Sequence, residues 1–308
     1  MMKIHLDTDL GGDTDDLCAL ALLLHWPDVE ITGITTVAED NGRRAGYARY
    51  ALGRAGRLDI PVAAGADAAY GPYRHPIPDL FPDEEVYWPT PVSRAPTPVA
   101  AALALLKRSI EADARIVAIG PYTNLALLDR AYPGLLARAD LYVMGGRLHP
   151  IPPGFPQWGN NMDANVQFDV ASARHIFARS HPTLVPLEMT VQTALRRAYL
   201  PALRVAGPLG ALLARQAEAI ARDWKIEETY GRTCQGLPTD IINFQHDPLT
   251  CAVALGWDGV TIEHARVSVE VREGWLYEWV DEAGQVMRVV TAVDSARFDE
   301  LWLRLVTA

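Results

Sequence analysis

Acidic residues crowd one short stretch near the start of the chain. Residues 7–16 read Asp-Thr-Asp-Leu-Gly-Gly-Asp-Thr-Asp-Asp, so five of these ten side chains are carboxylates. Like charges this close repel one another unless a cation neutralises them or some of the groups take up protons. Oxygen atoms are the ligands that Ca²⁺ and Mg²⁺ prefer. The stretch therefore predicts a divalent-cation site, because capping of a following helix accounts for only one or two of the carboxylates.

Two other kinds of acidic loop fit this stretch less well. An EF-hand loop needs an acidic residue at its fifth position and Glu at its twelfth. Counted from Asp7, these positions hold Gly11 and Cys18. A phosphohydrolase that uses Asp7 as its nucleophile would depend on Mg²⁺ and on a nearby lysine, and the chain is poor in lysine. A phosphohydrolase therefore stays open as an alternative interpretation.

Composition and charge limit the class of protein. The formal net charge is −10 and 49% of the residues are hydrophobic, as in a globular protein rather than a phosphate-tracking nucleic-acid binder. The longest apolar runs, 17–24 and 99–106, are about eight residues each, and a membrane span needs about twenty. Asp7 and Asp9 interrupt the first apolar run, so we expect no signal peptide. Three cysteines without metal spacing indicate a reducing, cytoplasmic location.

Strand-length apolar runs alternate with helical patterns along most of the chain. We expect strands at 3–6, 31–37, 60–64, 114–119 and 141–144, and helices at 16–26, 43–55 and 97–112. This alternation predicts an α/β fold with a mostly parallel, doubly wound central sheet and helices on both faces. Ligands bind at the carboxyl ends of the strands in such sheets, and the acidic stretch follows the first strand.

The C-terminal part of the chain changes to an antiparallel pattern. Two alternating runs, 265–271 and 275–280, flank a Glu-Gly pair typical of a hairpin turn, and a third strand is expected at 285–290. An amphipathic helix through Val306 closes the chain. No shift in composition marks a boundary, so we expect residues 1–308 to form one domain with a small antiparallel appendix.

Short motifs in order along the chain resemble those of the inosine/uridine-preferring nucleoside hydrolases. The family's N-terminal fingerprint, Asp-x-Asp-Pro-Gly-x-Asp-Asp, is matched by Asp7, Asp9, Asp15 and Asp16, with two extra residues in the loop. Residues 119–126, Ile-Gly-Pro-Tyr-Thr-Asn-Leu-Ala, are similar to the family's Gly-Pro-Leu-Thr-Asn-Leu-Ala. Further matches follow in family order at 33–37, 60–66, 144–146, 163–169, 186–190 and 246–249. The resemblance implies hydrolysis of a nucleoside's N-glycosidic bond, giving free base and ribose.

The resemblance also implies a metal and two catalytic residues. It places one Ca²⁺ between Asp9, Asp16, the carbonyl of Thr123 and Asp247. A metal-bound water would then attack the anomeric carbon, with Asp9 as general base. His246, next to the ligand Asp247, would be the general acid for the leaving base, since the pKa of an ordinary histidine lies near neutrality.

Seven residues are assigned to substrate binding by the same resemblance: Asp15, Asp40, Asn41, Asn160, Asn161, Asp163 and Asn165. Asp40 and Asn41 are alternatives, because the family's Gly-Asn after the second strand is altered here. Asn160 and Asn161 are also alternatives. Asp163 replaces a longer Glu, and residues 70–91 lack the family's His-Gly signature. These departures lie in the sugar and base pockets, so the reaction type is defined better than the substrate.

Two segments, 149–162 and 223–240, are expected to be irregular and to act as lids or loops. Their aromatic residues, Trp158, Trp224 and Tyr230, either stack on a base or anchor the segments to the body of the protein.

The resemblance implies that the partner is a small nucleoside, not a nucleic acid or a membrane. It also implies that the protein is a cytoplasmic enzyme of nucleoside catabolism. The family forms dimers and tetramers, so the resemblance implies a homo-oligomer. The non-enzymatic alternative is a ribose- or calcium-binding protein with the same fold and no turnover.

Overall fold

Most strands of the molecule belong to one twisted sheet. The computed structural model describes residues 1–11, 13–67 and 84–308. Within them, the large sheet has nine strands in the order β10-β9-β11-β6-β5-β4-β1-β2-β3. The six strands from β6 to β3 are parallel: β1 (Met2–Thr8), β2 (Val29–Thr36), β3 (Val62–Ala64), β4 (Arg115–Ala118), β5 (Leu141–Met144) and β6 (Thr183–Val185).

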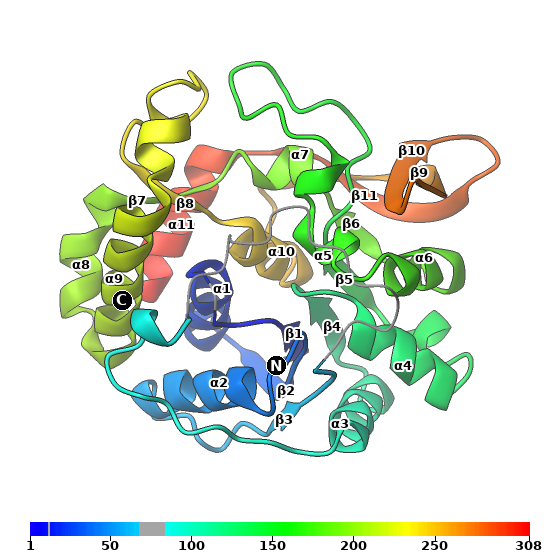
Figure 1. The fold of residues 1–308 in the computed structure, drawn as a ribbon, viewed down its shortest axis with the longest axis horizontal. Coiled ribbons are helices and arrows are strands. Elements are labelled where there is room, and N and C mark those ends of the chain that lie inside the picture. The colour runs from blue at the N-terminus through cyan, green and yellow to red at the C-terminus, as the bar shows by residue number, and fades with distance from the viewer. Residues whose placement is uncertain (12, 68–83) are drawn as a thin grey trace.

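Helices cover both faces of this sheet (Figure 1). The longer helices are α1 (Asp15–His25), α2 (Arg43–Arg54), α3 (Val99–Glu111), α4 (Thr123–Ala131), α6 (Val170–Arg179), α9 (Gly207–Trp224), α10 (His246–Ala254) and α11 (Ser295–Val306). Alternate residues of β4 face two separate cores, because successive strand side chains point to opposite faces. Ile116 and Ala118 pack with α3, α4 and α6, and Val117 packs with α1 and α10. The predicted mostly parallel sheet with helices on both faces is confirmed.

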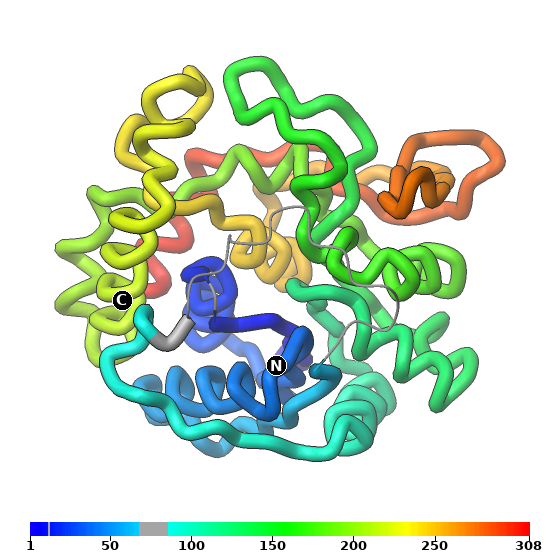
Figure 2. The backbone as a smooth tube through the Cα atoms, in the orientation of Figure 1, coloured from blue at the N-terminus to red at the C-terminus, as the bar shows by residue number. Residues whose placement is uncertain are grey.

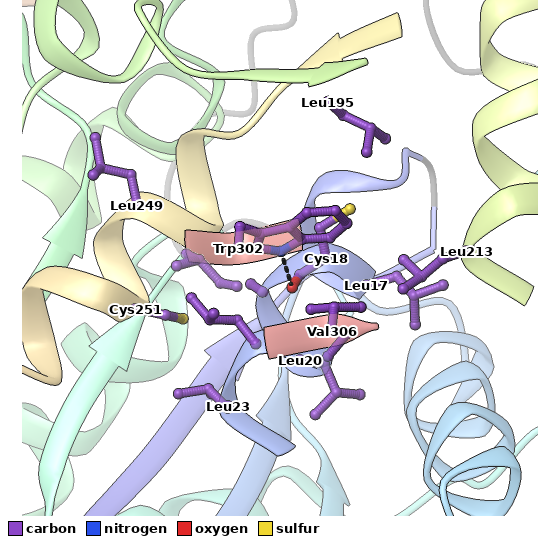
Figure 3. Close-up of a cluster of buried hydrophobic side chains, with 14 of the residues drawn as sticks. Leu17, Cys18, Leu20, Leu23, Leu195, Leu213, Leu249, Cys251, Trp302 and Val306 are labelled. Atoms are coloured by element: carbon purple, nitrogen blue, oxygen red, sulfur yellow. Dashed lines mark hydrogen bonds between the residues drawn. The ribbon is translucent and has the colours of Figure 1, made fainter. Parts of the chain in front are cut away.

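The helix that carries part of the acidic stretch rests on an apolar cluster (Figure 3). Leu17 and Leu20 of α1 are completely buried, as is Trp302 of α11. The indole Nε1 of Trp302 donates a hydrogen bond of 3.1 Å to the carbonyl of Cys18. This bond satisfies the one polar atom of a buried tryptophan and joins the last helix to the first.

The C-terminal strands form the predicted antiparallel appendix. They are β9 (Val260–Arg272), β10 (Trp275–Val280) and β11 (Gln285–Val293), and β11 joins the main sheet beside β6. The hairpin between β9 and β10 turns at Glu273 and Gly274, whose φ angles are 51° and 88°. Two successive positive φ angles are typical of the tight turn that matches the twist of a hairpin. Asp294 caps α11 by accepting a hydrogen bond from the amide of Arg297 over 3.1 Å.

Shorter elements connect these parts. They are η1 (Glu84–Tyr87), η2 (Leu136–Arg138), η3 (Asn160–Met162), α5 (Ala164–Gln167), α7 (Leu187–Thr190), η4 (Arg197–Tyr199), α8 (Leu200–Val205), the π-helical turn η5 (Glu227–Gly231), and a small sheet of β7 (Ala194–Arg196) and β8 (Ile241–Phe244). The expectation that 223–240 is irregular is wrong in part, because α9 ends in it and η5 lies within it. Residues 149–159 contain neither helix nor strand, as their prolines require.

No helix in the described part of the chain is long and apolar enough to cross a membrane. The three cysteines are free, and Cys18 and Cys251 are buried. The stretch 70–91, which departs from the family, lies outside the described residues up to residue 83.

Candidate active site

Asp7 is anchored inside the sheet at the end of β1. Its Oδ1 accepts hydrogen bonds from the Thr35 hydroxyl over 2.5 Å and from the Asn124 amide over 2.8 Å. The side chain is completely buried, and this burial raises the pKa of Asp7 to about 7. Asp7 therefore joins β1, β2 and α4 from within. A nucleophile has to reach a substrate, so this position counts against the phosphohydrolase alternative.

The other carboxylates gather where α1 meets α10. Oδ2 of Asp15 accepts a hydrogen bond of 3.2 Å from the amide of Asp247, and Oδ1 of Asp15 is buried without a partner in the described residues. Oδ1 of Asp16 accepts a hydrogen bond from the Thr8 hydroxyl. Burial, reinforced by mutual repulsion, raises the pKa of Asp15, Asp16 and Asp247 well above the ordinary value. The tertiary structure thus concentrates negative charge from both ends of the chain.

Asp9 and Asp13 are the more exposed acids of the loop. Oδ1 of Asp13 accepts a hydrogen bond of 2.7 Å from the Asp15 amide, so this side chain organises the start of α1. The carbonyl of Asp9 accepts a hydrogen bond from the Arg44 guanidinium, and Asp9 is half-buried. The charge of Asp9 raises the pKa of both Asp16 and Asp247, which places it in the same electrostatic group.

The carboxylates of the acidic loop and of Asp247 suit a hard divalent cation chemically. Their oxygen atoms are the ligands that such a cation prefers, and its positive charge would offset the repulsion between them. Among the described residues, Asp15 Oδ1 is a buried acceptor of this set that has no hydrogen-bond donor. Thr123 is buried and opens α4, and its hydroxyl donates to Asp169 over 2.8 Å. As the side chains stand, no three His, Cys, Asp or Glu residues of the described chain are arranged to hold a metal ion. Binding would therefore require these carboxylates to close around the ion.

His246 lies between a hydroxyl group and an aromatic group. Its Nδ1 is 2.7 Å from the Thr190 hydroxyl oxygen. Its ring centroid is 5.4 Å from that of Phe244 and 6.2 Å from that of Trp158. Burial lowers the pKa of His246 to about 3. The imidazole is therefore neutral near pH 7, where it acts as a hydrogen-bond donor through one ring nitrogen.

Aromatic side chains join the two long segments beside His246. Trp158 Nε1 donates a hydrogen bond of 3.0 Å to the Tyr230 hydroxyl, and the two ring centroids are 5.4 Å apart. Trp158 also packs on Phe244, with centroids 5.0 Å apart. Figure 2 shows both segments, 149–162 and 223–240, at the same end of the molecule. Trp158 and Tyr230 thus anchor the segments to each other in contact with the site, whereas Trp224 lies beside Tyr87.

Asp163 and Asn165 lie after β5, at the next part of the strand edge. Asp163 accepts hydrogen bonds from the amides of Gly146 over 2.6 Å and Val166 over 3.2 Å, so it caps α5. Burial raises the pKa of Asp163 to about 6. The Asn165 amide donates to the Ile119 carbonyl over 3.0 Å. Both residues therefore shape the strand edge through bonds to the backbone.

The structure separates the two asparagines that were alternatives for a sugar contact. Asn160 is buried, and its Nδ2 donates to Oε2 of Glu278 over 2.8 Å. Asn161 is exposed. Asn160 is thus the one built into the interior.

Asp40 and Asn41 are both exposed, on the turn before α2. The Asp40 carboxylate forms ion pairs of 2.8 Å with Arg43 and 3.0 Å with Arg94. The Arg94 hydrogen bond lowers the pKa of Asp40. Glu39, by contrast, is buried and accepts a hydrogen bond of 2.7 Å from the Ala45 amide. The ion pairs of Asp40 and the hydrogen bond to Glu39 therefore hold this turn in place, and the Asp40 side chain is exposed to solvent.

Two buried glutamates near the site were not recognised as candidates from the sequence. Oε1 of Glu188 accepts hydrogen bonds from the amides of Leu148 over 3.2 Å and His149 over 3.0 Å, and burial raises the pKa of Glu188 to about 7. Glu278 of β10 is only 5% exposed. The sequence offered one signal for Glu278. In the alternating strand Trp275–Val280, Glu278 shares the inward face with Leu276, and both residues are buried.

The fold and site define an α/β protein with carboxylates gathered at the carboxyl edge of a parallel sheet. The chain belongs to the inosine-uridine preferring nucleoside hydrolase family, whose profile matches residues 4–300. It is therefore a hydrolase that acts on N-glycosyl compounds and cleaves the N-glycosidic bond of nucleosides.

The chain is similar in sequence to curated proteins and shares its fold with solved structures. The chain is 29% identical over 291 residues to the pyrimidine-specific ribonucleoside hydrolase RihA of Salmonella arizonae, covering 88% of this chain and 85% of that one. It is 30% identical over 284 residues to the uncharacterised protein C1683.06c of Schizosaccharomyces pombe, covering 88% and 86%. A plant nucleoside hydrolase, PpNRh1, has the same fold with a TM-score of 0.79 at 23% identity, covering 100% of this chain and 99% of that one. A purine-preferring ribonucleoside hydrolase from Gardnerella vaginalis has a TM-score of 0.77 at 22% identity, covering 99% and 98%.

Proposed function

We propose that this protein uses Ca²⁺, held by Asp9, Asp16, the Thr123 carbonyl and Asp247, to hydrolyse a nucleoside to free base and ribose. The family is metal-dependent in general. The observation that carries the proposal is the hydrogen bond of 3.2 Å between Asp247 and Asp15, which brings the late aspartate into the N-terminal acidic group. When bound, the cation would supply the positive charge that lowers the pKa of an attacking water.

Asp9 is the proposed general base. It is the only one of the three proposed carboxylate ligands that is half-buried rather than buried, so it can reach a water at the open side of the loop. The reaction passes through an oxocarbenium-like state, so the sugar has to be held while its ring flattens. Asp15, whose buried Oδ1 has no donor within the described part of the chain, is the proposed partner for the sugar hydroxyls. Asp163 and Asn165 are proposed to contact the sugar from the β5 side of the site.

His246 is the proposed partner of the leaving base. Because burial lowers its pKa to about 3, it donates a hydrogen bond from a neutral ring rather than a full positive charge. Thr190, 2.7 Å from Nδ1, holds the ring in place. Trp158 lies next to this ring and donates a hydrogen bond to Tyr230, and both aromatic side chains are proposed to flank the base by stacking.

One relative is named pyrimidine-specific and one structural neighbour is named purine-preferring. We further propose that residues 1–308 act as one domain, in a homo-oligomer, in cytoplasmic nucleoside catabolism.

The decisive experiment is a panel of purine and pyrimidine nucleosides assayed for reducing sugar, with and without a chelator. We expect sugar release from at least one nucleoside, loss of release on chelation, and recovery with Ca²⁺. Phosphate release from phosphate esters without sugar release would favour the phosphohydrolase alternative through Asp7. Binding of Ca²⁺ and ribose with no hydrolysis would favour the non-enzymatic alternative.

A further inference from the structure

The C-terminal hairpin is attached to the loop and helix that follow β5. The side-chain amide of Gln167 in α5 bonds both backbone groups of Leu276 in β10. Leu276 N donates to Gln167 Oε1 over 3.0 Å, and Gln167 Nε2 donates to the Leu276 carbonyl over 2.9 Å. A primary amide in this position replaces the neighbouring strand that β10 lacks on its outer edge. The pair therefore fixes the position of β10 relative to the site.

Glu278 lies two residues further along β10, so it points to the same inward face as Leu276. It is 5% exposed, and its Oε2 accepts a hydrogen bond of 2.8 Å from Asn160. Its Oε1 is buried and has no hydrogen-bond partner among the described residues. A buried carboxylate oxygen without a donor is costly, so the structure is built for a donor that comes from elsewhere.

Neighbouring groups orient this free oxygen. Arg147 donates a hydrogen bond of 3.1 Å to Oδ1 of Asn160, which fixes the Asn160 amide so that its nitrogen faces Glu278. The buried hydroxyl of Tyr122 is influenced by the charges of Asp163, Glu278 and Asp247 together. The strand β10 also packs against η3 and α5, which flank Asp163, so the hairpin borders the β5 side of the site.

We propose that Oε1 of Glu278 accepts a hydrogen bond from the 5′-hydroxyl of the bound nucleoside and so determines specificity for the hydroxymethyl end of the sugar. This inference rests on the proposed function. A furanose carries its 2′- and 3′-hydroxyls on one edge and its 5′-hydroxyl on the other. Glu278 contacts Asn160 of η3, and β10 packs against both η3 and α5, the elements on either side of Asp163. With the first edge of the sugar at Asp15, the second edge would face this β5 side of the site, where Glu278 lies.

The test compares a nucleoside with its 5′-deoxy counterpart. Uridine or inosine, whichever is hydrolysed faster, is assayed with its 5′-deoxy form on the wild-type protein and on Glu278→Ala. For the wild type we expect kcat/KM to be about 10- to 100-fold higher for the 5′-hydroxyl substrate, because the 5′-deoxy form leaves a buried polar atom of Glu278 unpaired. In Glu278→Ala the ratio should fall to within about threefold of one, through loss on the 5′-hydroxyl substrate alone.

Two further variants separate this role from a structural one. Glu282→Gln changes an exposed carboxylate in the turn between β10 and β11 and should keep the wild-type ratio. If Glu278→Ala fails to fold in a thermal melt, Glu278→Gln takes its place, and its ratio should lie between those of wild type and one. An unchanged ratio, or an equal loss on both substrates, overturns the inference. Wild-type protein that hydrolyses no nucleoside would instead overturn the proposed function and this inference together.

Discussion

The backbone amide of Asp247 donates a hydrogen bond of 3.2 Å to the carboxylate of Asp15, although the two residues are 232 positions apart in the chain. The contact exists because α10 packs beside α1 on the same face of the sheet. It brings together carboxylates whose mutual repulsion opposes folding. Several measurable consequences depend on this arrangement and on the groups around it.

Replacing Asp247 with asparagine removes one repelling charge and keeps the backbone bond to Asp15. We expect the Asp247→Asn protein in chelator to melt at the wild-type temperature or above it, because a buried like charge is gone. We also expect Ca²⁺ affinity to fall at least about tenfold, since a ligand charge is lost. Calorimetric titration and thermal melts measure both effects. Glu300→Gln, an exposed change on α11, is the control, and unchanged Ca²⁺ affinity in Asp247→Asn would remove Asp247 from the metal site.

Replacing His246 tests its role with the leaving base. We expect His246→Ala to lower kcat by about 10²- to 10³-fold, the usual contribution of a positioned hydrogen-bond donor, and to change Ca²⁺ affinity by less than about threefold. Thr190→Val removes the group 2.7 Å from Nδ1 and should lower kcat by a smaller factor. Steady-state kinetics and calorimetry give both readouts. An equal loss of turnover and Ca²⁺ binding would mean that His246 is structural.

The Trp158–Tyr230 bond tests whether the two long segments act together. Tyr230→Phe removes the 3.0 Å hydrogen bond and keeps the ring contact. We expect KM for the preferred nucleoside to rise several-fold with kcat little changed, because the lost bond contributes about 0.5–1.5 kcal/mol to holding the segments. Protease sensitivity within 149–162 should rise in parallel. Tyr132→Phe, an exposed change, is the matched control, and a Tyr230→Phe protein with wild-type KM would show that the bond does not affect binding.

Asp299 gives a pH-dependent prediction away from the metal site. Its Oδ1 accepts a hydrogen bond of 3.1 Å from the Ala194 amide, and burial raises the pKa of Asp299 to about 7. A folded-state pKa above the unfolded value contributes stability that is complete below about pH 4 and is lost as the pH rises through about 7. We expect Asp299→Asn to lose less free energy of unfolding than wild type between pH 5 and pH 8.

Urea unfolding at several pH values measures this difference, on the order of 2–4 kcal/mol. Asp258→Asn, an exposed carboxylate change, should keep the wild-type pH dependence. Identical slopes of unfolding free energy against pH in wild type and Asp299→Asn would contradict the prediction.

Sequence patterns predicted the elements well where the signal is local. β5 lies at Leu141–Met144 as expected, and the β9–β10 turn falls on Glu273 and Gly274. Strand alternation and turn residues act over a few positions, so neighbouring residues carry the information. The partial error at 223–240 arose because this polar segment carries no strong local pattern, although Glu227–Gly231 forms the turn η5.

The sequence by itself determined the order of strands and helices, the acidic stretch after β1 and the family motifs, because periodicity and short motifs are written along the chain. Only the tertiary structure decided which side chains meet. It placed Asp40 at the surface between two arginines and Asn160 against Glu278. Asn160 and Glu278 are 118 positions apart, and their contact depends on how β10 docks beside α5. Such pairings follow from packing across the whole molecule, which no local pattern encodes.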